Sequence, residues 1–141
     1  MSENSGLAEA VGFHHVELWV PSLDRSRRSW DWLLTQLGWR HYQEWEHGCS
    51  WRAGAAYLVI EQSPVISSGI HDRMAPGLNH VALHAPSRSV VDEVNRNATE
   101  HGWSILFPER YPYAGGDAHY AGYLVDSDGY EAEIVAPDRS Q

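Results

Sequence analysis

Hydrophobic and polar residues alternate in two short segments, residues 15–20 and residues 80–85, and this alternation is typical of half-buried strands. In the first segment, His15, Glu17 and Trp19 fall on one face, because successive side chains of a strand point to opposite faces. A Pro-Ser pair ends both segments, and serine commonly caps the N-terminus of a helix. We therefore predict a strand followed by a helix at both places.

Apolar residues spaced three or four apart predict the two helices. They are Trp30, Leu33, Leu34 and Leu37 in the first helix and Val90, Val91, Val94 and Ala98 in the second. A Gly-Trp pair follows each pattern, and glycine is common directly after a helix. Further strand-like segments lie at about 39–46, 50–54 and 55–62, and then at about 103–107, 119–125 and 130–136. The chain thus repeats a β-α-β-β-β pattern.

We expect the two repeats to share a single α+β domain over residues 1–141. Module one covers about residues 13–62 and module two about residues 78–136. The segment 63–77 between them is rich in Ser, Pro and Gly, which is typical of a linker. A chain of 141 residues, 43% of them hydrophobic, buries its surface better in one core than in two very small ones.

Charge and cysteine content narrow the function classes. The formal net charge is −9 and the ten basic residues form no cluster, so the features of a nucleic-acid-binding protein are missing. No apolar run approaches the roughly 20 residues of a membrane span. A lone cysteine cannot form an internal disulfide, and the first residues do not resemble a signal peptide. We expect a cytoplasmic protein with a small-molecule ligand and no membrane partner.

A histidine opens each repeat, and a glutamate lies in each last strand, so we interpret His15, His80, Glu61 and Glu133 as metal ligands. Carboxylates among apolar strand residues are usually paired or metal-bound, although a solvated strand face is the simpler alternative for Glu61 alone. Imidazole and carboxylate groups suit Ni, Zn, Co, Mn or Fe. We expect these four residues to occupy equivalent positions in the two repeats. We also expect Glu61 or Glu133 to transfer a proton during catalysis. Glu131, two residues from Glu133, is a competing ligand.

Several other side chains are candidates for the walls of the pocket because they share a strand face with a predicted ligand or lie on a neighbouring strand. They are Glu17, Trp19, His84, His119 and Tyr123. The aromatic members favour a flat or apolar ligand.

Three segments resemble the vicinal oxygen chelate superfamily, which includes glyoxalase I, bleomycin-resistance proteins, extradiol dioxygenases and methylmalonyl-CoA epimerase. They are Phe13-His14-His15-Val16-Glu17-Leu18-Trp19-Val20, Gly77-Leu78-Asn79-His80-Val81-Ala82-Leu83 and Asp126-Ser127-Asp128-Gly129-Tyr130-Glu131-Ala132-Glu133. The resemblance covers about residues 13 to 136. It implies two βαβββ modules that form a curved mixed sheet around a metal-binding cleft, within one chain or across a homodimer.

The resemblance also implies roles for individual residues. His15, His80 and Glu133 match the ligand positions common to metal-binding members, and Glu61 matches the additional ligand and base of glyoxalase I. Trp19 stands where glyoxalase I has an arginine that binds glutathione, so we do not expect lactoylglutathione lyase activity itself.

Three functions stay open at this point. We favour a divalent-metal-dependent enzyme that acts on a small oxygenated molecule through an enediolate or enolate, as an isomerase, epimerase or lyase. One alternative is a drug-binding protein of the bleomycin-resistance type, for which the acidic charge and the tryptophans suit a planar cationic compound. The other is a single-domain Fe(II) ring-cleaving dioxygenase.

Overall fold

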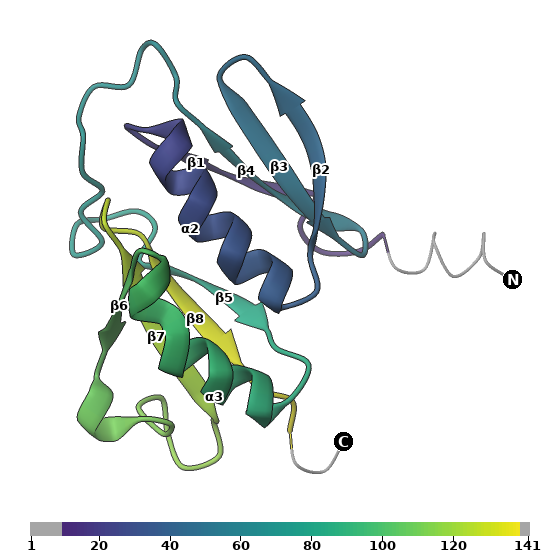
Figure 1. Cartoon of the computed structure of the whole chain (residues 1–141), viewed down its shortest axis with the longest axis vertical. Helices are drawn as coiled ribbons and strands as arrows, with labels where there is room; N and C mark the ends of the chain where they lie inside the picture. Colours follow the sequence, from purple (N-terminus) through teal and green to yellow (C-terminus); the bar gives the residue numbers. More distant parts are fainter. Residues whose placement is uncertain (1–9, 139–141) are drawn as a thin grey trace, which may run out of the picture. The chain divides into compact units, whose positions relative to one another are not determined.

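The repeat seen in the sequence is a structural repeat. The computed structural model describes residues 10–138, and the chain divides into two compact units, Met1–Ser67 and Ser68–Gln141. Each unit has the order β-α-β-β-β and forms one four-stranded mixed sheet (Figure 1). The α+β class and the two βαβββ modules that we predicted are confirmed.

Unit 1 consists of β1 (His15–Trp19), α2 (Leu23–Gln36), β2 (Arg40–Trp45), β3 (Gly48–Ala53) and β4 (Ala56–Glu61). The strand order is β1-β4-β3-β2, with β1 parallel to β4 and the other pairs antiparallel. Helix α2 begins after Ser22, whose Oγ accepts a hydrogen bond from the Arg25 backbone amide at 3.2 Å. Trp30, Leu33 and Leu34 are fully buried, as their spacing predicts.

Unit 2 consists of β5 (His80–His84), α3 (Arg88–Asn97), η1 (Ala98–His101), β6 (Trp103–Leu106), η2 (Pro108–Arg110), β7 (Ala121–Asp126) and β8 (Glu131–Val135). Its strand order, β5-β8-β7-β6, repeats that of unit 1, again with one parallel pair. Ser87 caps α3 by accepting from the Val90 amide at 3.2 Å. Val91 and Val94 are buried on the inner face of α3, whereas Val90 is only half-buried.

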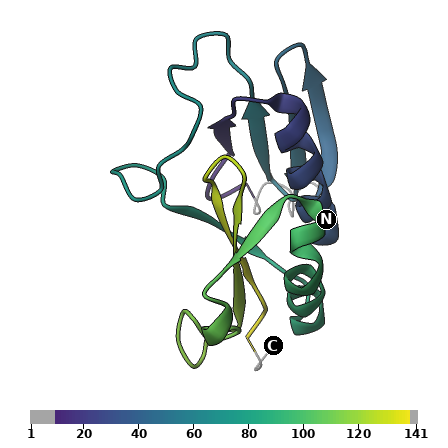
Figure 2. The same ribbon diagram turned by 60° about the vertical axis from the view of Figure 1, so that its left-hand side comes forward.

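The helix of each unit covers one face of its own sheet (Figure 2). In unit 1 this face includes Trp51, whose indole Nε1 donates to Asp31 Oδ1 on α2 at 2.8 Å. The opposite face of that sheet bears His15, Glu17 and Trp19, which are exposed. Strand alternation thus places the predicted ligand His15 and the pocket candidates Glu17 and Trp19 on the face that no helix of their own unit covers.

None of the helices within residues 10–138 combines the length and the apolar character that a transmembrane segment requires.

Candidate functional site

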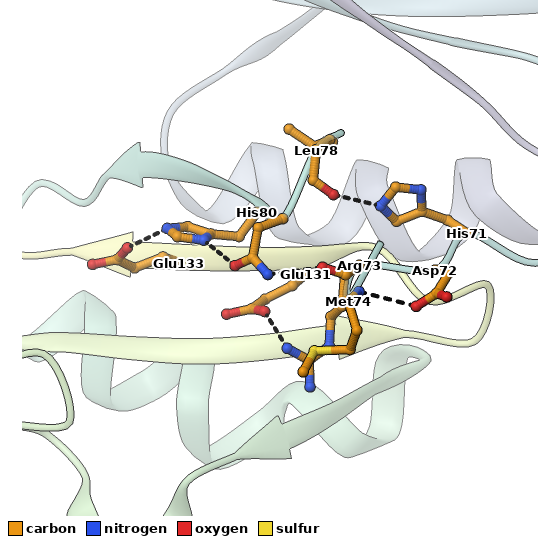
Figure 3. A network of polar contacts seen from close by, with 9 residues as sticks. His71, Asp72, Arg73, Met74, Leu78, His80, Glu131 and Glu133 are labelled. Atoms are coloured by element: carbon orange, nitrogen blue, oxygen red, sulfur yellow. Dashed lines mark hydrogen bonds and ion pairs between the residues drawn. The ribbon is translucent and has the colours of Figure 1, made fainter. Parts of the chain in front are cut away.

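His80 and Glu133 lie side by side in unit 2. They come from the adjacent parallel strands β5 and β8, in which Glu133 pairs with Ala82, two residues along from His80. The His80 Nε2 atom lies 3.1 Å from Glu133 Oε1, and the glutamate is only 6% exposed (Figure 3). Two of the four predicted metal ligands are therefore brought into direct contact.

Asn79 fixes the orientation and the tautomer of His80. The Asn79 side-chain Nδ2 donates to the Arg73 carbonyl at 2.9 Å, so its Oδ1 is the atom that faces His80 Nδ1, at 2.8 Å. Because an amide oxygen only accepts, the hydrogen of a neutral His80 ring is on Nδ1 and the lone pair is on Nε2. That lone pair faces the Glu133 carboxylate, an arrangement that requires a metal ion or a proton between the two groups. The donor set fits a divalent cation.

The second carboxylate oxygen of Glu133 is also occupied. It contacts His119 Nε2 closely and accepts a hydrogen bond from the Tyr123 hydroxyl at 3.1 Å. Burial, together with the charge of Glu133 and this hydrogen bond, raises the pKa of Tyr123 to about 12. The phenol therefore keeps its proton at neutral pH. Both residues, predicted as pocket candidates, are gathered around one carboxylate.

Glu131 has a partner of its own. It is buried, and Arg73 Nη1 lies 2.8 Å from its Oε1 (Figure 3). Arg73 comes from the segment that the sequence indicated only as a linker. His71 anchors that segment, because its amide donates to the Asp128 carbonyl at 2.8 Å and its ring stacks on Tyr130 at 4.4 Å. The ion pair with Arg73 weakens the case for Glu131 as a competing ligand.

The two glutamates are not at matched places, and this part of our interpretation is wrong. In unit 1, β1 pairs His15 with Tyr57 and Trp19 with Glu61, so Glu61 lies four residues along from His15. At about 3.3 Å per residue this separation is roughly 13 Å. The residue of unit 1 that occupies the Glu133 position is Val59. Sequence spacing alone missed this offset, because the pairing of β1 with β4 is not a local property.

Glu61 takes part in a different contact. Its Oε1 accepts from the indole Nε1 of Trp45 at 3.1 Å. The Trp45 ring lies against the Gly48 backbone, because a Cβ at Gly48 would come within 2.7 Å of the indole. A side chain at Gly48 would therefore displace the indole that holds Glu61.

Aromatic side chains occupy much of the exposed sheet face of unit 1. The His15 ring stacks on Tyr57, with ring centres 4.9 Å apart and an angle of 7° between the planes. Trp19 is 39% exposed, and its Nε1 donates to Glu17 Oε2 at 2.7 Å. The sequence singled out Trp19, but it missed Tyr57, whose ring lies 5.4 Å from that of Tyr42, and Trp45, which lies on the same sheet face beside Glu61. These contacts join different strands, so spacing along the chain does not reveal them.

His84 lies on the same face of β5 as His80, four residues along, and is exposed. Ala82, the strand partner of Glu133, lies midway between His80 and His84, but within residues 10–138 only His80 of these two histidines contacts the Glu133 carboxylate. Within residues 10–138, no three His, Cys, Asp or Glu side chains are grouped closely enough to hold a metal ion by themselves. The predicted ligands are divided equally between the units, with His15 and Glu61 in one and His80 and Glu133 in the other.

Comparisons with known proteins agree with this architecture. Residues 14–123 match the family model of the glyoxalase/bleomycin resistance protein/dioxygenase superfamily. The uncharacterized protein YqjT of Bacillus subtilis (strain 168) is 44% identical over 126 residues, which are 88% of this chain and 98% of that protein.

Two solved structures have the same fold. A putative glyoxalase from Bacillus halodurans is 44% identical, with a TM-score of 0.82 over 89% of this chain and 95% of the other. A glyoxalase/bleomycin resistance protein from Albidiferax ferrireducens T118 is 21% identical, with a TM-score of 0.72 over 89% of this chain and 98% of the other. The chain therefore belongs to the glyoxalase/bleomycin resistance protein/dioxygenase superfamily, the vicinal oxygen chelate group that its sequence motifs indicate.

Proposed function

We propose that the protein is a divalent-metal-dependent enzyme that acts on a small oxygenated molecule, with isomerase, epimerase or lyase chemistry. The observation that carries the proposal is the contact between His80 and Glu133, in which Asn79 turns the Nε2 lone pair of the histidine toward the carboxylate. Proteins of this superfamily generally use divalent metals. A histidine lone pair that faces a carboxylate suits a divalent metal ion, which agrees with the metal use that is general in this superfamily.

The ligand set that we propose consists of His80, Glu133 and His15, the histidine at the equivalent position of the other repeat. The register favours this set over one that includes Glu61, which lies four residues along from His15. Two imidazoles and one carboxylate leave positions open for the oxygens of a substrate. His15 comes from the same chain or from a second copy, and the homodimer stays a prediction, as does the cytoplasmic location.

When bound, a divalent ion supplies Lewis-acid stabilisation of negative charge on substrate oxygens. The residues of the chain do the rest. Asn79 holds the His80 ring in place, and the Tyr123 phenol holds a proton against Glu133. His119, whose side chain is 39% exposed, contacts the same carboxylate and can also reach solvent. We assign the proton transfer to His119, because it contacts Glu133, has an exposed ring and is not one of the residues that we propose as metal ligands.

The proposal is tested by metal content, measured by elemental mass spectrometry on untagged protein titrated with Ni, Zn, Co, Mn and Fe(II). We expect about one ion per chain, lost in His80→Ala. The matched control is His84→Ala, which removes a histidine from the same face of the same strand. Equal occupancy in His80→Ala and His84→Ala would contradict the proposal. Catechols and oxygen uptake belong in the substrate screen, because a ring-cleaving oxygenase would need Fe(II) and O₂.

A second function, binding of a drug without turnover, is favoured by the exposed aromatic surface of unit 1. Trp19 and Trp45 are 39% and 38% exposed at the Glu61 end of one sheet face, and Tyr42 and Tyr57 lie at its His15 end. This alternative predicts that no divalent ion binds and that a planar compound quenches the tryptophan fluorescence in a saturable way. Metal binding together with turnover of an oxygenated substrate would exclude it.

A further inference from the structure

We propose that Arg40 and Arg52 form an anion subsite on unit 1, which takes a doubly charged oxyanion group of the ligand. Both arginines occupy the sheet face that bears His15. The inference rests on the proposed function only in identifying this ligand with the substrate. The residues of the subsite all belong to unit 1.

The two arginines face each other without a carboxylate between them. Arg40 and Arg52 are direct partners in the antiparallel pair of β2 and β3. Side chains at such positions have Cβ atoms about 5 Å apart, and like charges there are destabilising. Neither guanidinium forms an ion pair with any residue of the part described, 10–138. A bound anion would relieve this repulsion.

The nearby acidic side chains have other partners. Glu44, on the same strand as Arg40, forms an ion pair with Arg27 Nη2 at 2.5 Å. Asp31 accepts the indole hydrogen bond of Trp51 on the helix-covered side of the sheet. The positive charge of the arginine pair is therefore not neutralised locally, although the chain as a whole carries a formal charge of −9.

Arg52 is already held in a binding orientation. Its Nε donates to the Gly54 carbonyl at 3.1 Å, which leaves its two terminal amino groups for a ligand. The guanidinium also lies over the Tyr42 ring, 5.0 Å from the ring centre. Gly54 adopts a positive φ of 58°, so the turn that presents its carbonyl suits glycine. A side chain held by two contacts loses little freedom on binding.

A hollow of 570 Å³ adjoins the arginine pair. It is lined by Gly38, Arg40, His41, Tyr42, Arg52, Ala53 and Gly54. The described lining residues thus contribute two guanidinium groups and no carboxylate. Arginine binds phosphate and carboxylate groups through paired hydrogen bonds, and a phosphate monoester carries a charge of about −1.5 to −2 at pH 7. A dianion therefore matches the charge of the two arginines.

A row of rings connects the arginines to His15. Arg52 pairs with Tyr57 across β3 and β4, and Tyr57 pairs with His15 across β4 and β1. The Tyr42 and Tyr57 rings are 5.4 Å apart. With strands about 4.8 Å apart, Arg52 lies roughly 10 Å and Arg40 roughly 14 Å from β1. The ligand class is thus an elongated molecule with an anionic end at the arginines, a flat or apolar middle over the tyrosines, and oxygens at the His15 end.

Titration of inorganic phosphate into the metal-free full-length protein tests the subsite, by calorimetry at low ionic strength, with succinate and acetate as parallel ligands. We expect saturable phosphate binding that Arg40→Gln and Arg52→Gln each weaken by about tenfold or more. The matched control is Arg28→Gln, which removes the same charge from an exposed position on α2 and should change the affinity less than about twofold.

A second readout separates a binding role from a structural one. If the arginine pair serves binding rather than stability, ligand-free Arg40→Gln should melt at a higher temperature than the wild type, because the repulsion between the two guanidinium groups is relieved. Saturable succinate binding without phosphate binding would support the subsite and assign it to carboxylates. No saturable binding of either dianion, a preference for acetate, or equal phosphate binding by the variants would overturn it. Phosphate binding should be unchanged in His80→Ala, so a failure of the proposed metal site can be distinguished from a failure of the proposed anion subsite.

Discussion

The two units have the same scaffold, but their equivalent sheet faces carry different chemistry. In unit 2 the parallel pair of strands places His80 beside the buried Glu133 carboxylate. In unit 1 the equivalent parallel strands, β1 and β4, stack the His15 ring on Tyr57. The position that Glu133 occupies in unit 2 is occupied by Val59 in unit 1. Repetition of a fold therefore repeats backbone positions, whereas the side chains at those positions decide what each copy can bind.

This difference supports a division of roles. Unit 2 has a carboxylate with His80, His119 and Tyr123 around it, which suits a metal ion and proton transfer. Unit 1 has an aromatic surface and a pair of arginines, which suit the body and the charged end of a ligand.

The Gly-Trp pair of each repeat looks the same in the sequence but differs in burial. Trp103 is 2% exposed, whereas Trp39 is only half-buried. We expect Trp103→Ala to lower the free energy of unfolding by about 3–5 kcal/mol and Trp39→Ala to cost clearly less, since less surface returns to water. Urea denaturation followed by circular dichroism measures both. Equal losses would mean that the two repeats are packed alike, contrary to the burial.

The turns before β4 and β8 each contain a glycine with positive φ, 58° at Gly54 and 96° at Gly129. An alanine at either position costs about 1–2 kcal/mol for the backbone conformation. At Gly129 the new Cβ would also lie 2.2 Å from the His71 carbonyl oxygen, while Gly54 has open space. We therefore expect Gly129→Ala to be the more destabilising of the two in thermal denaturation. A larger effect at Gly54 would show that the His71 segment moves aside easily.

Cys49 is the one cysteine of the chain and lies, fully buried, in unit 1. Burial raises the pKa of its thiol to about 11 from an ordinary value of 9, and the thiolate is the reactive form. The stability that this shift contributes is present below pH 9 and lost as the pH rises from 9 to about 11. Native protein at pH 8 should react with a thiol reagent only through opening of unit 1.

The same probe sharpens the comparison between units. The opening free energy obtained from the labelling rate of Cys49 can be compared with the global free energy of unfolding. If Trp103→Ala lowers both by the same amount, the units unfold together. If labelling is unchanged, unit 1 opens independently of the damaged unit 2. Rapid labelling of wild-type protein would contradict the burial of Cys49.

Much of the fold could be predicted from the sequence, because it depends on local signals. The caps Ser22 and Ser87, the apolar helix faces and the alternating strands each follow from residues close together in the chain. His14 shows where such reasoning stops. Strand alternation predicts that its side chain points away from that of His15, but the strand begins at His15, and the Nδ1 atoms of the two rings lie 2.9 Å apart.

The parts of the site that the sequence missed depend on cross-strand register. The pairing of β1 with β4 moves Glu61 two residues beyond the Glu133 position, and the pairing of β2 with β3 sets Arg40 opposite Arg52. No spacing within one strand encodes either fact. Likewise, the Ser-rich and Gly-rich segment gave no sign that Arg73 would neutralise the buried Glu131.

The most direct test of the account neutralises the two glutamates in turn and measures the affinity for the metal ion that the wild type binds best. Glu133→Gln and Glu61→Gln remove the same charge from the last strand of each unit. We predict that Glu133→Gln lowers the affinity by about 100-fold or more and that Glu61→Gln changes it less than about threefold. An equal loss in both variants, or a larger loss in Glu61→Gln, would contradict the assignment of the metal half-site to His80 and Glu133.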